Sequence, residues 1–212
     1  KLRVFAAGSF TNIVSAVLVL LLVVSLFPPT PSGVLIAEIT PGGGAERAEI
    51  PQWSVITAIN DTRVIQRGNI MTILAVAEPG DNVTVTLSDG REFFVTTGQA
   101  PENASRAILG ITPAPFLYFA ANVPLPPLFS YHTFNALNWM LIVLFGVGLV
   151  NMLPLFPFDG DRYFDTILNR FGLKNTKPAR VAATIFSLSL LGLNLAFSYA
   201  AWVTAPRSQV SI

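Results

Sequence analysis

The sequence predicts a polytopic α-helical membrane protein with three transmembrane helices and one inserted α+β domain. Of its 212 residues, 52% are hydrophobic and only 12% are charged. The mean hydropathy of +0.58 is too high for an ordinary soluble domain. Three apolar stretches are each long enough to cross a bilayer core of about 30 Å. A long segment between the first two stretches instead alternates apolar and polar residues, as strands do.

The three spans are predicted at residues 1–27, 135–160 and 181–204. Three prolines directly after the first span end its helix. Trp139 lies near one end of the second span, where an interfacial aromatic residue is expected. The surrounding lipid bilayer is therefore the first expected partner.

Lysine and arginine in the short flanks set the predicted orientation. Two of them lie at the start of the first span, five lie in the basic loop 161–180, and one follows the third span. Because positive charge is retained on the cytoplasmic side, we expect residues 160–180 to be cytoplasmic and residues 28–134 to be extracytoplasmic.

Residues 28–106 are predicted to form the inserted domain. Its strands are expected at residues 33–39, 54–60, 82–88 and 91–97. The last two are joined by Asp89-Gly90, which is a strong hairpin signal. A helical turn is expected over 45–48, and the apolar spacing over 69–77 predicts a helix.

Residues 107–134 are apolar but contain five prolines, which argue against a spanning helix. We expect an interfacial or re-entrant segment packed beside the spans. A plain linker is the alternative.

The stretch 151–160, Asn-Met-Leu-Pro-Leu-Phe-Pro-Phe-Asp-Gly, ends the second span and is the most informative part of the chain. A carboxylate beside the hydrocarbon is energetically expensive and is usually kept for function. The alternative is that Asp159 only pairs with the neighbouring Arg162.

This stretch resembles the second metal-binding motif of the site-2 protease family, the intramembrane zinc metalloproteases. The resemblance implies that Asp159 is a zinc ligand and that Asn151 acts close to the cleaved bond. An asparagine in a span can equally serve an interhelical hydrogen bond. Pro154, Pro157 and Gly160 are the structural members of the motif.

Two positions depart from the family pattern. Phe158 stands where Leu is usual, and Asp161 stands where a second Gly is frequent. Asp161 either offers a second carboxylate or pairs with Arg162 or the Lys/Arg cluster that follows.

Gly8-Ser-Phe-Thr-Asn12 resembles a Gly-x-x-x-Asn motif that follows the zinc-binding helix of the same family. Gly8 permits close helix contact, and Asn12 offers a polar group near the level of Asp159. We therefore expect Asn12 to contribute to substrate binding.

The inserted domain resembles the circularly permuted PDZ modules of membrane and periplasmic proteases. The resemblance implies that it binds peptide ends by adding them as a strand to an open sheet edge. Gly33, Val34, Leu35 and Ile36 would form the carboxylate loop and that edge. A β-rich domain that only spaces the helices is the alternative.

A catalytic zinc site keeps three protein ligands, and the metal lowers the pKa of its bound water toward about 7. In the site-2 family the other two ligands come from a His-Glu-x-x-His helix. This sequence has one histidine, His132, and no such motif. We therefore expect that helix to lie upstream of Lys1, and the 212 residues alone to be inactive.

The sequence thus predicts the C-terminal portion of a site-2-type zinc metalloendopeptidase acting in regulated intramembrane proteolysis. Its substrate would be a membrane-anchored protein. A net charge of +1 gives no sign of nucleic-acid binding. One alternative is a membrane-anchored PDZ scaffold or an inactive relative that binds without cutting. A transporter-like protein that carries ions on Asp159 is weaker, because relays usually need several ionisable groups.

Overall fold

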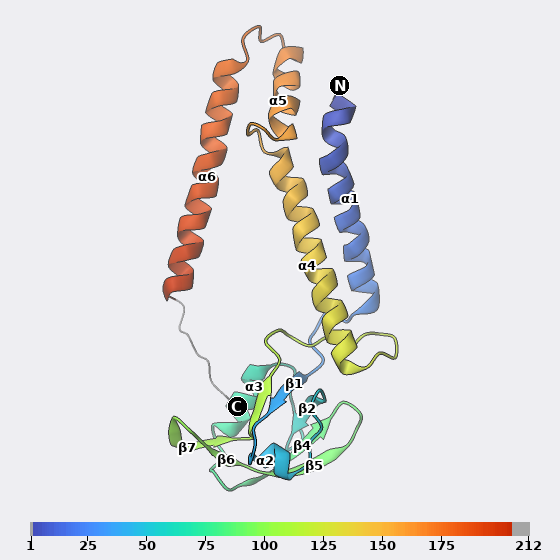
Figure 1. Cartoon of the computed structure of the whole chain (residues 1–212), viewed down its shortest axis with the longest axis vertical. Helices are drawn as coiled ribbons and strands as arrows, with labels where there is room; N and C mark the ends of the chain where they lie inside the picture. The colour runs from blue at the N-terminus through green and yellow to red at the C-terminus, as the bar shows by residue number, and fades with distance from the viewer. Residues whose placement is uncertain (1, 205–212) are drawn as a thin grey trace. The chain divides into compact units, whose positions relative to one another are not determined.

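The computed structural model describes the backbone of residues 2–204 and the side chains of residues 8–204. The chain divides into two compact units. Val23–Ala136 forms the unit that contains the inserted domain, and helical segments before and after it form the other (Figure 1). Each unit has its own architecture.

The helical unit is built from four helices, two of which also extend into the other unit. They are α1 (Leu2–Leu26), α4 (Pro127–Met152), α5 (Asp159–Arg170) and α6 (Lys177–Thr204). Among the described residues, α1, α4 and α6 are long and apolar enough to span a membrane. Their most apolar windows have mean hydropathies of 2.4, 1.8 and 1.8. This agrees with the three predicted spans.

Helices α1 and α4 approach closely at Gly148. A Cβ atom on Gly148 would lie 2.8 Å from Cγ1 of Ile13 and 3.4 Å from the carbonyl oxygen of Ser9. Small residues permit such close backbone contact between membrane helices. Ser9 is fully buried, and its hydroxyl has no hydrogen-bond partner among the described residues.

The helix boundaries differ from the predicted ones. α4 begins at Pro127, not at residue 135, because proline fits the first helical position, where its missing N–H is not needed. The first half of the expected loop 161–180 is helical in α5, and α6 begins at Lys177, before residue 181.

The inserted domain is built on one antiparallel sheet with the strand order β5-β4-β2-β1-β8 and with β3 paired to β2. The sheet strands are β1 (Val34–Ile39), β2 (Val55–Ile59), β3 (Thr62–Arg63), β4 (Asn82–Leu87), β5 (Glu92–Thr96) and β8 (Ile111–Pro113). A separate hairpin pairs β6 (Gly98–Ala100) with β7 (Asn103–Ile108). The helices are α2 (Gly44–Arg47) and α3 (Arg67–Leu74).

The core of the domain lies between one face of the sheet and the helix α3. In β4 the alternating residues Val83, Val85 and Leu87 are buried, while the residues between them are not. Ile70 and Leu74 of α3 belong to the same buried cluster. Each such side chain contributes about 1.5–3 kcal/mol when fully buried. The four strands and the helix predicted from alternation and spacing are thereby confirmed.

The domain extends past residue 106, so the predicted boundary is too early. β8 pairs with β1, and both Leu109 and Ile111 are fully buried in the core. The start of the predicted interfacial segment 107–134 is therefore part of the sheet. The prolines do exclude a helix there, but Pro113 lies in an edge strand, where a missing N–H is tolerated.

The chain after β8 runs back along β1 and joins α4 within the same unit. Tyr118 forms a bridge with Gly33 and packs with Leu35 and Tyr131 in a second buried cluster. Burial raises the pKa of the Tyr118 phenol above its ordinary value, while a hydrogen bond with Ser130 acts in the opposite direction. These contacts make residues 113–118 an ordered part of the domain.

Candidate functional site

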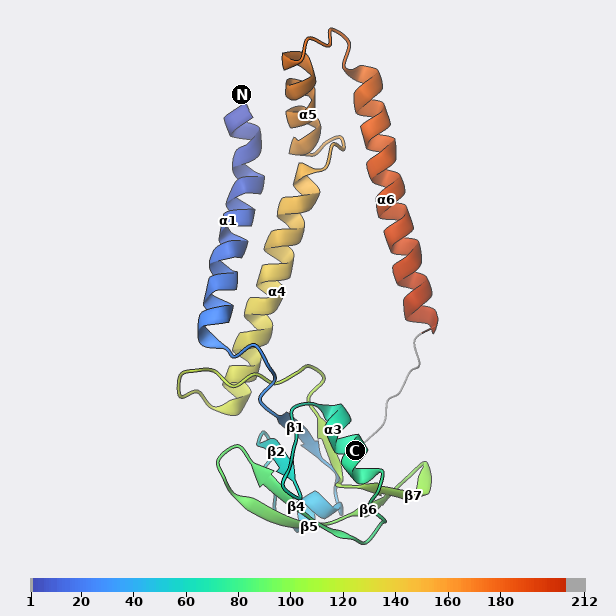
Figure 2. The same cartoon turned by 180° about the vertical axis from the view of Figure 1, so that it is seen from behind.

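Asp159 is the first residue of α5, directly after the turn that separates α5 from α4 (Figure 2). α4 ends at Met152, two residues before Pro154, because the residue preceding a proline is driven out of the helical conformation. The helix therefore breaks at the first proline of the motif, before the predicted end of the span at residue 160. A negative charge at the first position of α5 also interacts favourably with the helix dipole.

Gly160 makes this turn compact. A Cβ atom at this position would lie 2.2 Å from the carbonyl oxygens of both Met152 and Leu153. No side chain fits in that space, so only glycine lets α5 start this close to the end of α4. The structural role predicted for Gly160 has a direct steric cause.

The carboxylate of Asp159 faces α1 at Gly8. A Cβ atom on Gly8 would lie 4.0 Å from Oδ2 of Asp159, which is ordinary van der Waals contact. Asp159 forms no hydrogen bond or ion pair among the described residues, so the alternative in which it only pairs with Arg162 is not seen. The oxygen lone pairs of Asp159 are therefore not occupied by a hydrogen-bond donor or a cation among the described residues.

The two other aspartates of α5 are bound by side chains. Asp161 is buried and accepts two hydrogen bonds from Arg180, one of them 2.8 Å from Nε to Oδ1. Asp165 accepts a 2.5 Å hydrogen bond from Thr176 and lies 3.6 Å from Nη1 of Arg180. Of the two roles left open for Asp161, the structure shows the pairing with the Lys/Arg cluster, through Arg180.

Asn12 and Asn151 are both half-buried, on α1 and in the last turn of α4. Among the described residues, neither side chain forms a hydrogen bond with Asp159. The structure thus brings Gly8 to Asp159, while the substrate-binding role of Asn12 and the catalytic role of Asn151 stay predictions.

The described residues do not complete a metal site. None of their His, Cys, Asp and Glu side chains gather in a group of three or more that could hold an ion. A catalytic zinc ion needs three protein ligands. His132 is exposed in the first turns of α4 and belongs to the other compact unit. Asp159 fits one oxygen ligand, and the remaining ligands would have to come from outside the described residues.

The open edge of the sheet does not lie at the predicted residues, and the peptide-binding role of Gly33, Val34, Leu35 and Ile36 stays a prediction. β1 has a neighbour on each side, because Val34 and Leu35 pair with β2 and the strand pairs with β8 from Ile36 onward. Gly33 is packed against β2, where a Cβ atom would lie 2.5 Å from the carbonyl oxygen of Ile56. Residues 33–36 therefore form an interior strand, and the open edge beside them is β8.

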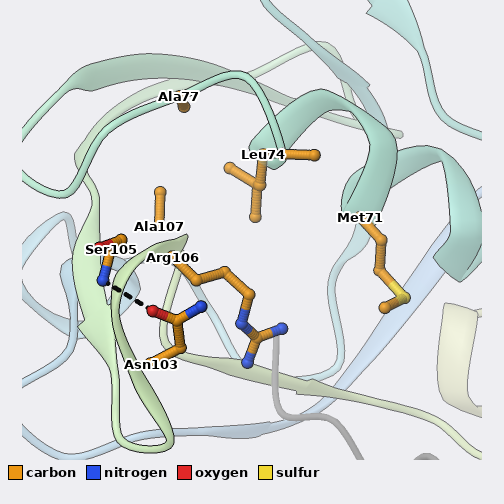
Figure 3. Close-up of a pocket in the computed structure, with 8 residues that line it drawn as sticks. Met71, Leu74, Ala77, Asn103, Ser105, Arg106 and Ala107 are labelled. Atoms are coloured by element: carbon orange, nitrogen blue, oxygen red, sulfur yellow. Dashed lines mark hydrogen bonds between the residues drawn. The ribbon is translucent and has the colours of Figure 1, made fainter.

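Two hollows lie beside α3, on the side of β7 and β8. The larger, of about 350 Å³, is lined by α3 and the residues after it and by β7. Figure 3 shows Arg106 reaching from β7 into the space beside Leu74 and Met71. The smaller, of about 110 Å³, lies between the start of α3, the chain from Pro113 to Tyr118 and residues 33–35, which are three of the four predicted peptide-binding residues. Of the β8 residues, Pro113 lines the smaller hollow and none lines the larger.

The profile of Peptidase family M50 matches residues 1–195, which is most of the chain. This chain belongs to Peptidase family M50. The membership confirms the site-2 protease resemblance and suggests a metalloprotease. In this M50 chain, the match includes both Gly8 and Asp159.

Two solved structures are similar to part of the M50 chain. The PDZ domain of an SdrC-like protein from Listeria monocytogenes is 15% identical, covers 41% of this chain and 93% of its own, and has a TM-score of 0.37. A solution structure of a Geobacillus thermodenitrificans protein is 21% identical, covers 38% of this chain and 95% of its own, and has a TM-score of 0.34. The search of curated proteins found no match.

Two structural features near the candidate sites of the M50 chain were not predicted from sequence. β8 is a three-residue strand that contains a proline, so its alternation is too short to detect. Arg180 was placed only in a basic cluster, because its contact with Asp161 crosses from one helix to the next. In the sequence, the only sign of that contact was an Asp where a Gly is frequent.

Proposed function

We propose that this M50 chain supplies the aspartate ligand and the peptide-selecting domain of an intramembrane zinc metallopeptidase. The enzyme would cleave membrane-anchored proteins within their span, near the cytoplasmic side. The main support is the Asp159 carboxylate, which has no partner among the described residues although both other aspartates of α5 have one. An unpaired carboxylate at the end of an apolar helix is a strong candidate for a functional group.

Different residues of this chain would bind the metal ion and the substrate. Zinc, when bound, polarises the scissile carbonyl and activates a water molecule. Asp159 would hold the ion from the start of α5, and Gly8 leaves the space beside its carboxylate free of a side chain. Asn151, half-buried in the last turn of α4, would bind the backbone of the substrate close to the cleaved bond.

The inserted domain would select substrates by their exposed peptide ends. Among the described residues, β8 has β1 as its only neighbour in the sheet, so its other side offers backbone groups to an added strand. The hollow between α3 and β7 would take the last side chain of the peptide. Its lining by Leu74 and Ala107 favours an apolar residue.

The deciding experiment measures zinc binding and cleavage by the full-length protein with Asp159→Asn. We expect the variant to lose at least about 100-fold in zinc affinity and to lose cleavage, since removal of groups that merely support a ligand already costs about 10–100-fold. Asp61→Asn is the matched control, because Asp61 is exposed and asparagine tolerates its positive φ of 59°. Unchanged zinc affinity in Asp159→Asn would contradict the proposal.

The second candidate is an M50 relative that binds peptides without cutting. It is favoured by the absence of a three-ligand group among the described residues. Under this alternative, full-length wild-type protein binds no zinc but still binds peptides through the inserted domain. Stoichiometric zinc in the wild type would exclude it.

A further inference from the structure

The turn that carries Asp159 is attached to α6 at both of its ends. In the two cartoon views α5 lies between α1 and α6, and all three helices belong to the same compact unit (Figures 1 and 2). Asp161 bonds to Arg180, and Pro154 bonds to Thr184. One contact lies at the start of the turn and the other lies at its end.

The first attachment fixes the direction in which Asp159 points. Arg180 binds the buried Asp161 through Nε and a terminal nitrogen, which is the two-bond geometry that a guanidinium fork makes with a carboxylate. Residues two apart in a helix differ by roughly 200° in direction. With Asp161 held against α6, Asp159 therefore points to the opposite side, where Gly8 of α1 lies.

The second attachment holds the start of the turn. The hydroxyl of Thr184 donates a 3.1 Å hydrogen bond to the carbonyl oxygen of Pro154. Thr184 follows Arg180 by four residues, so both side chains lie on one face of α6. The bond satisfies a carbonyl group just past the end of α4, where the intrahelical donors are missing.

Phe156 in the middle of the turn is not packed against α6. A cavity of about 400 Å³ lies between the turn and α6, lined by Phe156 on one side and by Val181 and Ile185 on the other. Phe156 is 78% exposed, whereas its neighbour Leu155 is buried. At Phe156 the turn is therefore separated from α6, and the polar contacts of Thr184 and Arg180 hold it on either side.

We propose that Arg180 and Thr184 are positioning residues, which clamp the turn 154–161 and so hold the Asp159 carboxylate ready for a metal ion. The clamp rests on the proposed function, in which Asp159 is the ligand. It depends on Asp161, since a glycine at that position, as is frequent in the family, has no side chain for Arg180 to bind.

The test compares Arg180→Met with the double variant Asp161→Gly/Arg180→Met in the full-length protein. Zinc affinity is measured by competition with a chelator, and thermal unfolding is measured on the metal-free protein. Arg180→Met leaves Asp161 buried without its partner, so it should both unfold at lower temperature and bind zinc about 10–100-fold more weakly. The double variant removes both charges and should regain thermal stability.

Zinc affinity of the double variant decides between the two roles of the ion pair. If the pair positions Asp159, zinc binding stays at least about 10-fold weaker although stability is restored. If the double variant binds zinc as the wild type does, the pair is only structural and the proposal is overturned. A wild-type protein without zinc would instead overturn the proposed function, and the positioning role with it.

Thr184 is tested by Thr184→Val, which keeps the shape and removes the donor, and by Thr184→Ser, which restores it. We expect weaker zinc binding in the first and recovery in the second; equal affinities would remove Thr184 from the clamp. Two matched controls lie on the same helix. Lys177→Met removes a cation that lines the same cavity and has no ion-pair partner among the described residues. Ser189→Ala removes a hydroxyl that bonds only to Ile185 of its own helix.

Discussion

The three aspartates of α5 show how neighbouring copies of one side chain differ in role. Asp161 and Asp165 are bound by Arg180 and Thr176, whereas Asp159 has no partner among the described residues. The sequence predicted Asp159 from its motif. It left Asp161 open between two roles, because a contact that crosses a loop depends on how α5 and α6 pack, which no local pattern encodes.

Gly160 gives the sharpest steric prediction at this scale. Gly160→Ala places a methyl group 2.2 Å from two carbonyl oxygens, so the start of α5 must move away from the end of α4. We expect a loss of about 1–3 kcal/mol in unfolding free energy from overpacking. We also expect about 10-fold or weaker zinc binding, because Asp159 moves with the turn.

Gly192→Ala is the control for this change. Gly192 lies in α6, and no described atom lies within 4 Å of a Cβ atom placed there. Alanine should be neutral or slightly stabilising at such a helical position. If Gly160→Ala has the same unfolding free energy and the same zinc affinity as Gly192→Ala, the turn is not as tight as its geometry implies.

At the scale of secondary-structure elements, a strand was predicted more accurately when its alternation of apolar and polar residues extends over more positions. The strands β4 and β5 alternate over five or six residues around Asp89-Gly90 and were predicted nearly to their ends. β8 has three residues, and only its pairing with β1 identifies it as a strand. Because β8 was not predicted, the open edge of the sheet was assigned to residues 33–36. These residues lie beside β8, one strand inside the edge.

The new position of the edge predicts which substitutions affect peptide binding. Met71→Asp places a charge on the α3 side of the larger hollow, where an apolar side chain of the peptide would be buried. We expect at least about 10-fold weaker binding of a fluorescent peptide with an apolar C-terminal residue, since 1.4 kcal/mol already corresponds to tenfold. Fluorescence anisotropy with the full-length protein measures the change.

Thr72→Asp is the matched control, because Thr72 is the next residue of α3 and does not line that hollow. It adds the same charge to the same helix, so long-range electrostatic effects are shared. Equal weakening by both substitutions would locate the peptide elsewhere on the domain.

At the scale of the whole molecule, hydropathy predicted the number of long apolar helices because each is apolar over at least 18 residues. It could not predict where α4 begins. The first turns of α4 pack in the inserted domain through Tyr131, so tertiary contacts rather than hydropathy extend the helix to Pro127. The same contacts explain why the boundary between the two compact units falls inside α4.

The orientation of the chain is a whole-molecule prediction that its lack of cysteine makes easy to test. The positive-inside rule puts the α5–α6 connection in the cytoplasm and the inserted domain outside. A single cysteine at Phe171, which is 80% exposed in that connection, should react with a membrane-impermeant maleimide only after the cells are opened. A single cysteine at Ser88, an exposed residue beside the β4–β5 turn, should react in intact cells. The reverse pattern would place Asp159 at the opposite membrane surface and would require cleavage on the side of the membrane away from the cytoplasm.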